Sequence, residues 1–139
     1  MRSPIERIKV SKKGKDQLIK LKRITKIENW NILCRWAFCR SIAEQNIPAP
    51  FPIPTDSNLE MTWQVFGGDM ADLLLLVLKQ RCYQDGFDLD NETLNHQFRL
   101  HLHRGIGYLV GDLSIKKIDD LVNLPLTLPE QQKINSQNN

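Results

Sequence analysis

The chain has 139 residues, with 19 Lys or Arg, 16 Asp or Glu, and 41% hydrophobic residues. This length and composition suit one soluble globular domain and exclude the collagen-like, disulfide-stapled and wholly disordered classes. At this size folding buries roughly two-thirds of the surface that the unfolded chain exposes, so a core can form without a metal or a disulfide.

Charge is distributed unevenly along the chain. Residues 1–50 contain 12 basic and four acidic side chains, whereas residues 51–139 contain seven and 12. Nine Lys and Arg against one Asp lie between Arg7 and Lys26. Because repulsion within such a cluster opposes folding, the cluster predicts a polyanionic partner, either nucleic acid or an anionic membrane surface.

The cysteines and the apolar runs bear on the compartment. Cys34, Cys39 and Cys82 form no Cys-x-x-Cys motif and are expected to be small buried apolar residues. The N-terminal segment lacks the apolar stretch of a signal peptide, and the longest apolar run, 73–78, is far shorter than the ~20 residues that span a bilayer. These features predict a cytoplasmic protein with no membrane partner.

The N-terminal third predicts a strand followed by two helices. Apolar and charged residues nearly alternate over 5–10, as is typical of a short half-buried strand. Ser11 is placed to cap a helix over about 12–26, whose apolar residues recur at three-residue steps. A second helix is predicted over about 29–45.

The rest of the chain predicts a connector and a second group of helices. Prolines at every second position over 48–54 forbid a helix, and 60–66 is β-prone or an extended lead-in. The helix over about 70–83 is apolar on all sides, so it is expected to be central, enclosed by its own chain or by a second subunit. A helix over about 91–104 or further is expected, and then a short amphipathic helix after Ser114.

Together these elements predict a mainly α-helical protein. The expected parts are a basic strand–helix–helix unit at 1–46, a proline-rich connector at 47–58, a helical core or oligomerisation half at 59–124, and a disordered tail at 125–139. We expect them to form one compact domain overall.

The predicted first helix carries a one-sided cationic face. At ~100° per residue, five of its cations fall within roughly a third of the helical wheel: Lys12, Lys15, Lys22, Arg23 and Lys26. Such a face can neutralise several phosphates without reading bases, and its binding should weaken steeply with salt. The alternative is a solvated lysine-rich face.

The strand–helix–helix order resembles the ribbon-helix-helix DNA-binding unit, in which a dimer pairs two strands and lays them in the major groove. In such a unit Arg7, Lys9 and Ser11 would face DNA, while Ile8 and Val10 would close the core. The alternative is an edge strand that its charges keep soluble.

Other motifs that suggest chemistry are incomplete. The three histidines over 96–103 cannot converge from one helix, so no metal site is predicted. His96, Arg99 and His103 are expected to form either a mildly basic patch that touches DNA or an exposed face. The three glycines over 105–111 lack the spacing and strand of a nucleotide loop and are expected to mark close helix packing or a helix end. No nucleophile is paired with a base, so we predict no catalytic residue and no cofactor.

Three segments resemble the DndE family of the bacterial DNA sulfur modification (phosphorothioation) system: RIKVSKKGKDQLIKLKRITKIENWNILCRWAFC, TWQVFGGDMADLLLLVLKQRC and HLHRGIGYLVGDLSIKKI. The similarity spans about residues 4–120. It implies a DNA-binding accessory subunit that prefers nicked duplex, forms homotetramers and works beside the other Dnd proteins. In that family DNA contacts are attributed to surface lysines, which by position correspond here to Lys12, Lys13, Lys15, Lys20, Lys22, Arg23 and Lys26. Lys26 occupies a turn position where glycine would be ordinary, so the turn departs from the family pattern.

The expected function is therefore to hold double-stranded DNA without catalysis. Two alternatives remain. A scaffold for partner proteins predicts complexes that survive nuclease treatment and a weak salt dependence of DNA binding. A transcriptional regulator that reads bases through the strand predicts a strong preference for one sequence.

Overall fold

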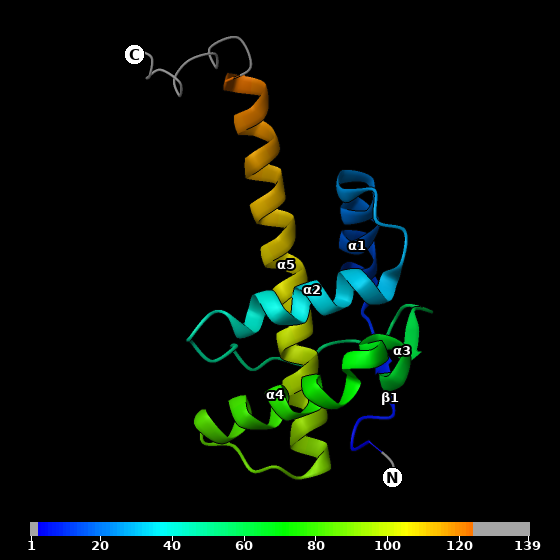
Figure 1. Ribbon diagram of the computed structural model, residues 1–139, viewed down its shortest axis with the longest axis vertical. Helices are drawn as coiled ribbons and strands as arrows, with labels where there is room; N and C mark the ends of the chain where they lie inside the picture. The colour runs from blue at the N-terminus through cyan, green and yellow to red at the C-terminus, as the bar shows by residue number, and fades with distance from the viewer. Residues whose placement is uncertain (1–2, 124–139) are drawn as a thin grey trace.

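The computed structural model describes residues 3–123, and the helix α5 (Asn91–Asn123) runs along its whole length (Figure 1). Asp90 begins α5 by accepting hydrogen bonds from the Thr93 backbone N–H at 3.2 Å and from the Thr93 hydroxyl at 2.7 Å. These bonds lower the pKa of the Asp90 carboxyl. The helix continues without a break to Asn123. The prediction of a separate helix after Ser114 is therefore wrong, because the three glycines do not interrupt α5.

The N-terminal third has the predicted order of elements. The strand β1 (Arg7–Lys9) is followed by α1 (Lys12–Thr25) and α2 (Trp30–Ile42). The α1–α2 turn begins at Lys26, whose φ of 64° is left-handed and whose backbone N–H donates to the Lys22 carbonyl. This conformation usually selects glycine, as the sequence indicated.

The strand β1 finds its partner within the same chain. It pairs antiparallel with β2 (Glu60–Thr62), and Ile8 lies opposite Met61. The ribbon-helix-helix resemblance is therefore not confirmed, since in that unit the strand pairs with a second subunit. After β2 come the short helix α3 (Trp63–Gly67), a 3-10 turn (Gly68–Met70) and the helix α4 (Ala71–Gln84).

The helix α2 crosses α5 in close contact. A Cβ added to Gly105 of α5 would overlap the backbone carbonyl of Ala37 on α2, so the glycine permits this approach. Close helix packing, one of the two expectations for this glycine, is confirmed. Beside the crossing lie Phe38, Phe66 and Phe98, with ring centroids between 5.1 and 6.1 Å apart. The core thus joins residues from both sides of the proline-rich segment.

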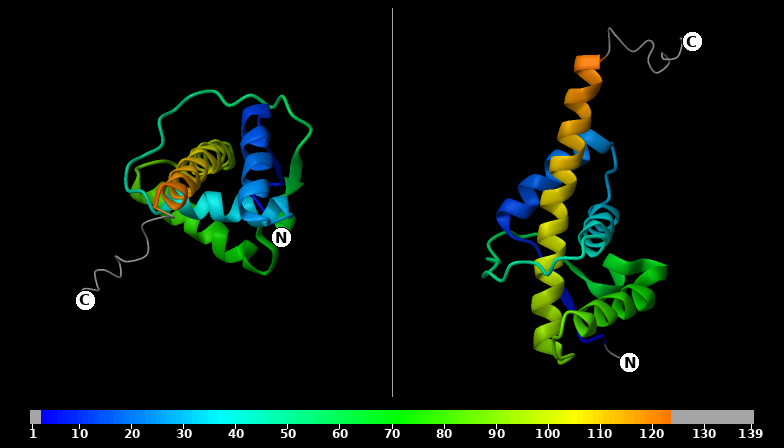
Figure 2. Two further views of the ribbon diagram at one scale, coloured as in Figure 1. Left: turned by 90° about the horizontal axis from the view of Figure 1, so that it is seen from above. Right: turned by 90° about the vertical axis from the view of Figure 1, so that its left-hand side faces the viewer.

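The proline-rich segment loops around α5 and the start of α1, on the side away from α2 (Figure 2). The Arg99 guanidinium of α5 donates to the Ile53 carbonyl at 3.0 Å and to the Pro54 carbonyl at 3.2 Å. The same side chain donates to the Lys9 carbonyl at 3.3 Å. One arginine therefore fastens this segment and β1 to the long helix.

The helix α4 is peripheral, so the prediction that it is central is wrong within the chain. Its inner side buries Ala71, Leu74 and Leu78, but Leu73 is 53% exposed and Leu76 is 62% exposed. The continuous apolar run shows that the helix is apolar on all sides and does not show which side the chain covers. Cover by a second subunit stays a prediction.

Two arginines close the end of α2. Arg81 donates to the carbonyls of Ile42 and Asn46, each at 2.9 Å, and Arg104 donates to the Ser41 and Asn46 carbonyls, each at 2.8 Å. The bonds to Ser41 and Ile42 satisfy backbone acceptors that a helix end leaves without intrahelical partners, and the bonds to Asn46 hold the segment that follows.

Beside these arginines, His101 is fully buried, and its Nδ1 lies 2.8 Å from the Ser41 hydroxyl. Burial, with a contribution from the nearby positive charges of Arg81 and Arg104, lowers the pKa of His101 to about 3. The imidazole is therefore neutral at ordinary pH.

Two further sequence predictions are affected. Cys34 and Cys82 are buried, but Cys39 is exposed on α2, so its predicted burial is wrong. Among the helices of residues 3–123, none is both long and apolar enough to cross a bilayer. The tail predicted at 125–139 lies outside the described residues.

Candidate nucleic-acid interface

The helix α1 is held at its first turn by contacts with two other segments. The Ser11 hydroxyl accepts a hydrogen bond from the Gly14 N–H at 3.0 Å, as its N-cap position predicted. The Ser11 backbone N–H donates to Nε2 of His103 on α5 at 3.0 Å, and the Lys12 N–H donates to the Asp56 carboxylate at 2.8 Å. The orientation of α1 is thus fixed by α5 and by the segment that follows the prolines.

The inner side of α1 is apolar and small. Gly14, Leu18 and Leu21 are buried. A Cβ on Gly14 would lie 3.0 Å from Cγ1 of Val10 and 3.1 Å from Cδ2 of His103, which leaves little room for a side chain. With this stripe against the core, the cationic residues of the helix must point outward.

The outer side of α1 and the following turn form what we call the basic face. Five of its cations are exposed and two are half-buried: Lys12, Lys13, Lys20, Arg23 and Lys26, with Lys15 and Lys22 half-buried. Its one carboxylate, Asp16, lies 3.7 Å from the Lys12 ammonium, and both side chains are more than 60% exposed. Because an exposed ion pair is weak and salt-sensitive, the face keeps a strongly positive potential.

The two half-buried lysines have defined positions. The Lys15 ammonium donates to the Asn58 side-chain carbonyl at 2.7 Å, and the Lys22 ammonium lies 3.9 Å from the centroid of the Trp30 ring. A neutral amide and an aromatic ring orient these ammonium groups without neutralising them. Less side-chain entropy is then lost when such a group meets a phosphate. The sequence did not predict either contact, because both partners lie outside α1.

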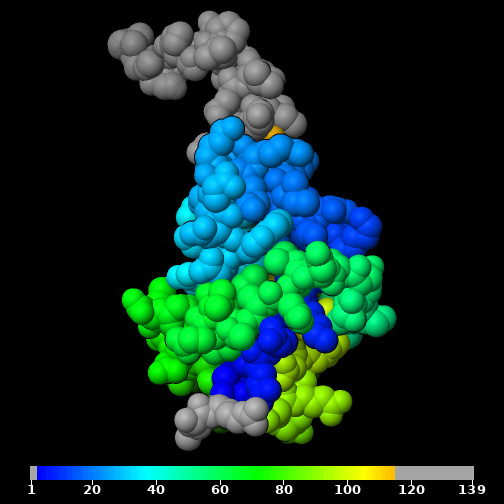
Figure 3. All heavy atoms as spheres, turned by 90° about the vertical axis from the view of Figure 1, so that its right-hand side faces the viewer, coloured from blue at the N-terminus to red at the C-terminus, as the bar shows by residue number. Residues whose placement is uncertain are grey.

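The two predicted strand residues lie apart from most of the basic face. Arg7 and Lys9 are exposed on β1, and an Arg7 guanidinium nitrogen is 4.0 Å from the Glu60 carboxylate across the sheet. Figure 3 shows β2 and α3 between much of the N-terminal segment and α1 on one side of the molecule. The structure therefore groups the cations of α1 and does not place those of β1 in the same row.

Two members of the patch suggested around His96 have structural roles. Nε2 of His103 accepts the Ser11 N–H, and its Nδ1 lies 2.9 Å from the Arg99 carbonyl, which assigns the ring proton to Nδ1. Burial and, to a smaller extent, the charge of Arg99 lower the pKa of His103, although the bond to the carbonyl opposes this. Arg99 is engaged with three backbone carbonyls. Neither side chain is a free surface group.

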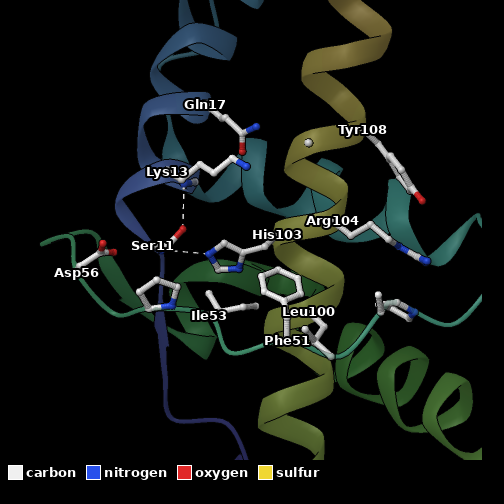
Figure 4. A pocket seen from close by; sticks show the side chains of 15 residues that line it. Ser11, Lys13, Gln17, Phe51, Ile53, Asp56, Leu100, His103, Arg104 and Tyr108 are labelled. Carbon is white, nitrogen blue, oxygen red and sulfur yellow. Dashed lines mark hydrogen bonds between the residues drawn. The ribbon is translucent and has the colours of Figure 1, made fainter.

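A pocket opens beside the basic face, and sequence reasoning missed it. It has a volume of about 540 Å³ and lies between α1, the proline-rich segment and α5. In Figure 4, Lys13 and Gln17 extend from α1, Phe51 and Ile53 come from the proline-rich segment, and Leu100 comes from α5. The sequence signal for this pocket was Phe51, an aromatic residue among the alternating prolines.

Within residues 3–114, whose side chains are described, no group of three His, Cys, Asp or Glu side chains is arranged to hold a metal ion. Partial burial raises the pKa of the Cys39 thiol. At a given pH, a smaller fraction of Cys39 is therefore in the thiolate form than of a free cysteine. The basic face and the adjoining pocket remain the candidate site.

The fold and this site define a small, mainly helical protein whose first helix presents a cationic surface suited to a polyanion. The profile of the family described as DNA sulphur modification protein DndE matches residues 7–117. A crystal structure of DndE from Escherichia coli B7A, described as involved in DNA phosphorothioation modification, is 30% identical, with a TM-score of 0.63 over 75% of this chain and 95% of that one.

A second similar structure is a DndE mutant with two glycines changed to lysine, described as involved in DNA phosphorothioation. It is 29% identical, with a TM-score of 0.60 over 76% of this chain and 97% of that one. No curated protein matches the chain significantly. The chain belongs to the DndE family of DNA sulphur modification proteins.

Proposed function

We propose that this protein is a non-catalytic, cytoplasmic DNA-binding subunit of the DNA phosphorothioation machinery, and that it holds double-stranded DNA along its basic face. The observation that carries the proposal is the exposure of α1's cations with a single, weakly paired carboxylate among them. Membership of the DndE family supports DNA as the ligand and DNA sulphur modification as the pathway. The proposed contacts are made by the α1 cations, with Arg7 and Lys9 contributing from β1.

The chemistry of the face favours holding the DNA backbone over reading bases. Ammonium groups on flexible stems act as point charges toward phosphates, whereas base discrimination usually needs bidentate partners inserted into a groove. Each phosphate contact releases condensed counterions, so affinity should decline steeply as salt rises. A nick makes a duplex easier to bend, which lets more phosphates reach a curved protein surface. The proposal therefore includes nicked duplex as a substrate.

The proposed assembly is a homotetramer that works beside other Dnd proteins, as the family resemblance implies. Support in this chain comes from the outer side of α4, where Leu73 is 53% exposed and Leu76 is 62% exposed. Neighbouring exposed apolar side chains are typical of surfaces that bind protein. An assembly would also place several basic faces on one particle and raise the affinity for DNA through multivalency.

A binding series tests the proposal. Random-sequence duplex of one length, intact or nicked, is titrated with the protein at several salt concentrations by fluorescence anisotropy. The test variant is Lys20→Gln, Arg23→Gln and Lys26→Gln, because the side chains of these three residues are exposed. The matched control is Lys79→Glu with Asn91→Asp, which removes the same three units of charge outside α1.

The expected result is specific to α1. The test variant should weaken binding on the order of a hundredfold at low salt and reduce the salt slope by about 3, whereas the control should resemble the wild type. Equal effects of the two variants would show that net charge, and not the basic face, governs binding. A wild-type affinity that does not depend on salt would also contradict the proposal.

A scaffold that joins partner proteins is the second candidate, and the exposed outer side of α4 favours it. In that case partner complexes should survive nuclease treatment, and the α1 variant should retain them. Pull-down of the other Dnd proteins with and without nuclease separates the two functions.

A further inference from the structure

We propose that the pocket beside α1 receives one unpaired nucleobase from DNA held on the basic face. The inference deepens the proposed function and rests on it. It assigns the pocket a ligand class, a base that has left its partner strand. It also gives the protein a means of distinguishing DNA that contains an unpaired nucleotide from fully paired duplex.

The size and walls of the pocket suit a flat, largely apolar ligand. Its volume of about 540 Å³ lies in the range of roughly 300–1,000 Å³ that is typical of small-molecule sites. The proline-rich segment contributes Phe51 and Ile53 to the lining, and α5 contributes Leu100 and Gly107. Figure 4 shows the first three of these side chains. Phe51 lines the pocket and is 53% exposed, so part of its ring surface is accessible to a ligand.

On the α5 side of the pocket, the polar lining side chains are held by hydrogen bonds within the protein. Arg104 lines the pocket, but its guanidinium is bound to the Ser41 hydroxyl and to two backbone carbonyls. His103 lines it as well and is bound at both ring nitrogens. The pocket is therefore rigid on its α5 side, which lowers the entropic cost of binding.

The charge at the mouth selects an anionic ligand. Lys13 and Gln17 project from α1 beside the opening. The same two residues line a shallow hollow together with Lys12 and Lys20, whose ammonium groups with that of Lys13 outnumber the hollow's two carboxylates, Asp16 and Asp56. Pocket and basic face are thus continuous through Lys13. A base in the pocket would carry its 5′ or 3′ phosphate past this ammonium, whereas an apolar protein side chain would leave that charge without a counterion.

The polar groups near the opening can bond to a base edge. The Gln17 amide has a donor and an acceptor, and one carboxylate oxygen of Asp56 accepts the Lys12 N–H. The second oxygen of Asp56 can accept from an exocyclic amino group. These partners are few, so stacking should dominate and preference among bases should be modest.

Energetics restrict the ligand to bases that are already unpaired. Extracting a base from an intact duplex costs a few kcal/mol in lost pairing and stacking, and that cost is least at a damaged or single-stranded position. A half-open pocket, even with Phe51 and Tyr108 in its lining, cannot offset the full cost. The pocket should therefore leave the affinity for intact duplex unchanged and raise the affinity for duplex that contains an unpaired nucleotide.

The chain offers a matched pair of variants on one helix. A Cβ at Gly107 or at Gly111 would meet no atom within 4 Å, but only Gly107 lines the pocket. Gly107→Leu should fill the pocket and Gly111→Leu should not, and each replaces a helical glycine by a better helix former. Phe51→Ala tests the stacking wall from another segment, and thermal melting confirms that all three variants fold.

Three DNA probes of equal length separate the contributions. They are a fully paired duplex, the same duplex with one extra unpaired thymidine, and that bulged duplex with an abasic nucleotide in place of the thymidine. The abasic probe keeps the bend and the phosphate of the bulge and removes only the base.

The wild type and Gly111→Leu should bind the thymidine bulge about tenfold more tightly than the other two probes, the effect expected of one stacked base. Gly107→Leu and Phe51→Ala should lose this preference and keep the wild-type affinity for paired duplex. A wild type that binds all three probes equally, or a Gly107→Leu protein that keeps the preference, overturns the inference while the proposed function stands. If the wild type bound none of the duplex probes, both this inference and the proposed function would be overturned.

Discussion

The helices α1 and α4 have the same length, 14 residues, and opposite outer surfaces. Each buries a narrow stripe against the core, Leu18 and Leu21 on α1 and Leu74 and Leu78 on α4. Outside that stripe α1 presents cations, whereas α4 presents leucine side chains. The core needs only the stripe, so the remaining surface of each helix is free to specify a partner.

The two surfaces differ in the forces that they can exert. A cationic row acts over roughly 10 Å at moderate salt and loses strength as salt rises. An apolar surface acts only in contact, in proportion to the area buried, and salt weakens it little. Changes on α1 should therefore alter DNA binding and leave self-association intact, and changes on α4 should do the reverse.

The largest effect is expected from Leu73→Glu together with Leu76→Glu. Burying four leucines across a symmetric dimer contact is worth roughly 1.5–3 kcal/mol per side chain, so the association constant should fall by at least about a thousandfold. Light scattering should then give a mass below that of the tetramer, because one symmetric contact joins the chains in pairs and a homotetramer needs a second contact. Lys79→Glu adds the same two units of negative charge to the same helix, at least about 60° around the helix from both leucines, and should leave the assembly unchanged. An assembly that survives the leucine changes would show that another surface forms the contact.

The next largest effect is expected at the crossing of α2 and α5. Gly105→Ala places a methyl group against the Ala37 carbonyl and should lower the free energy of unfolding by roughly 3 kcal/mol or more, because two helices must separate. Gly111→Ala, on the same helix with open space around it, should raise stability by up to about 1 kcal/mol. Urea unfolding at neutral pH measures both. Similar midpoints for the two variants would show that the crossing adjusts easily.

The contrast between α1 and α4 also shows what the sequence could predict. For α1, Ser11 as a cap and apolar residues at three-residue steps predicted the helix, its buried side and its cationic side, because all this information is local. For α4, the same kind of pattern was apolar on every side. Local periodicity then predicted the helix and could not show that Leu76 lies outside the core.

Features that join distant segments were beyond local patterns. The pairing of Ile8 with Met61 depends on the path of the chain between them, and that pairing replaced the expected dimeric ribbon. The role of Gly105 depends on the approach of α2 at that point of α5. The pocket required α1, Phe51 and α5 to be placed together, so only the cationic half of the candidate site was predictable.

A smaller loss of stability should appear on acidification, through two histidines of α5 that contact different segments. His103 holds the first turn of α1, and His101 lies among Ser41, Arg81 and Arg104 at the end of α2. Both have pKa values lowered in the folded state, so below about pH 6.5 the unfolded chain binds protons that the folded chain does not. Stability should therefore be full above that pH and fall as the pH drops toward the folded pKa. His101 alone should account for roughly 1 kcal/mol between pH 7.5 and 5.5.

Urea unfolding at these two pH values checks this effect, and two variants assign it. His101→Gln should flatten the pH dependence, and His103→Gln should flatten it further while loosening α1. Hydrogen exchange should then show faster opening of α1 in His103→Gln and not in His101→Gln. A pH dependence that remains when both histidines are replaced would assign the effect to the carboxylates.

The smallest effect is expected at Lys26, where the needs of the fold and those of the basic face conflict. Its φ of 64° is costly for a residue with a Cβ, so Lys26→Gly should raise the free energy of unfolding by roughly 1 kcal/mol. The same change removes one exposed cation and should weaken DNA binding a fewfold at low salt. Lys26→Gln removes the charge and keeps the Cβ, so it should show the binding loss without the gain in stability. If Lys26→Gly improves stability and leaves binding unchanged, the basic face ends within α1 and does not include the turn.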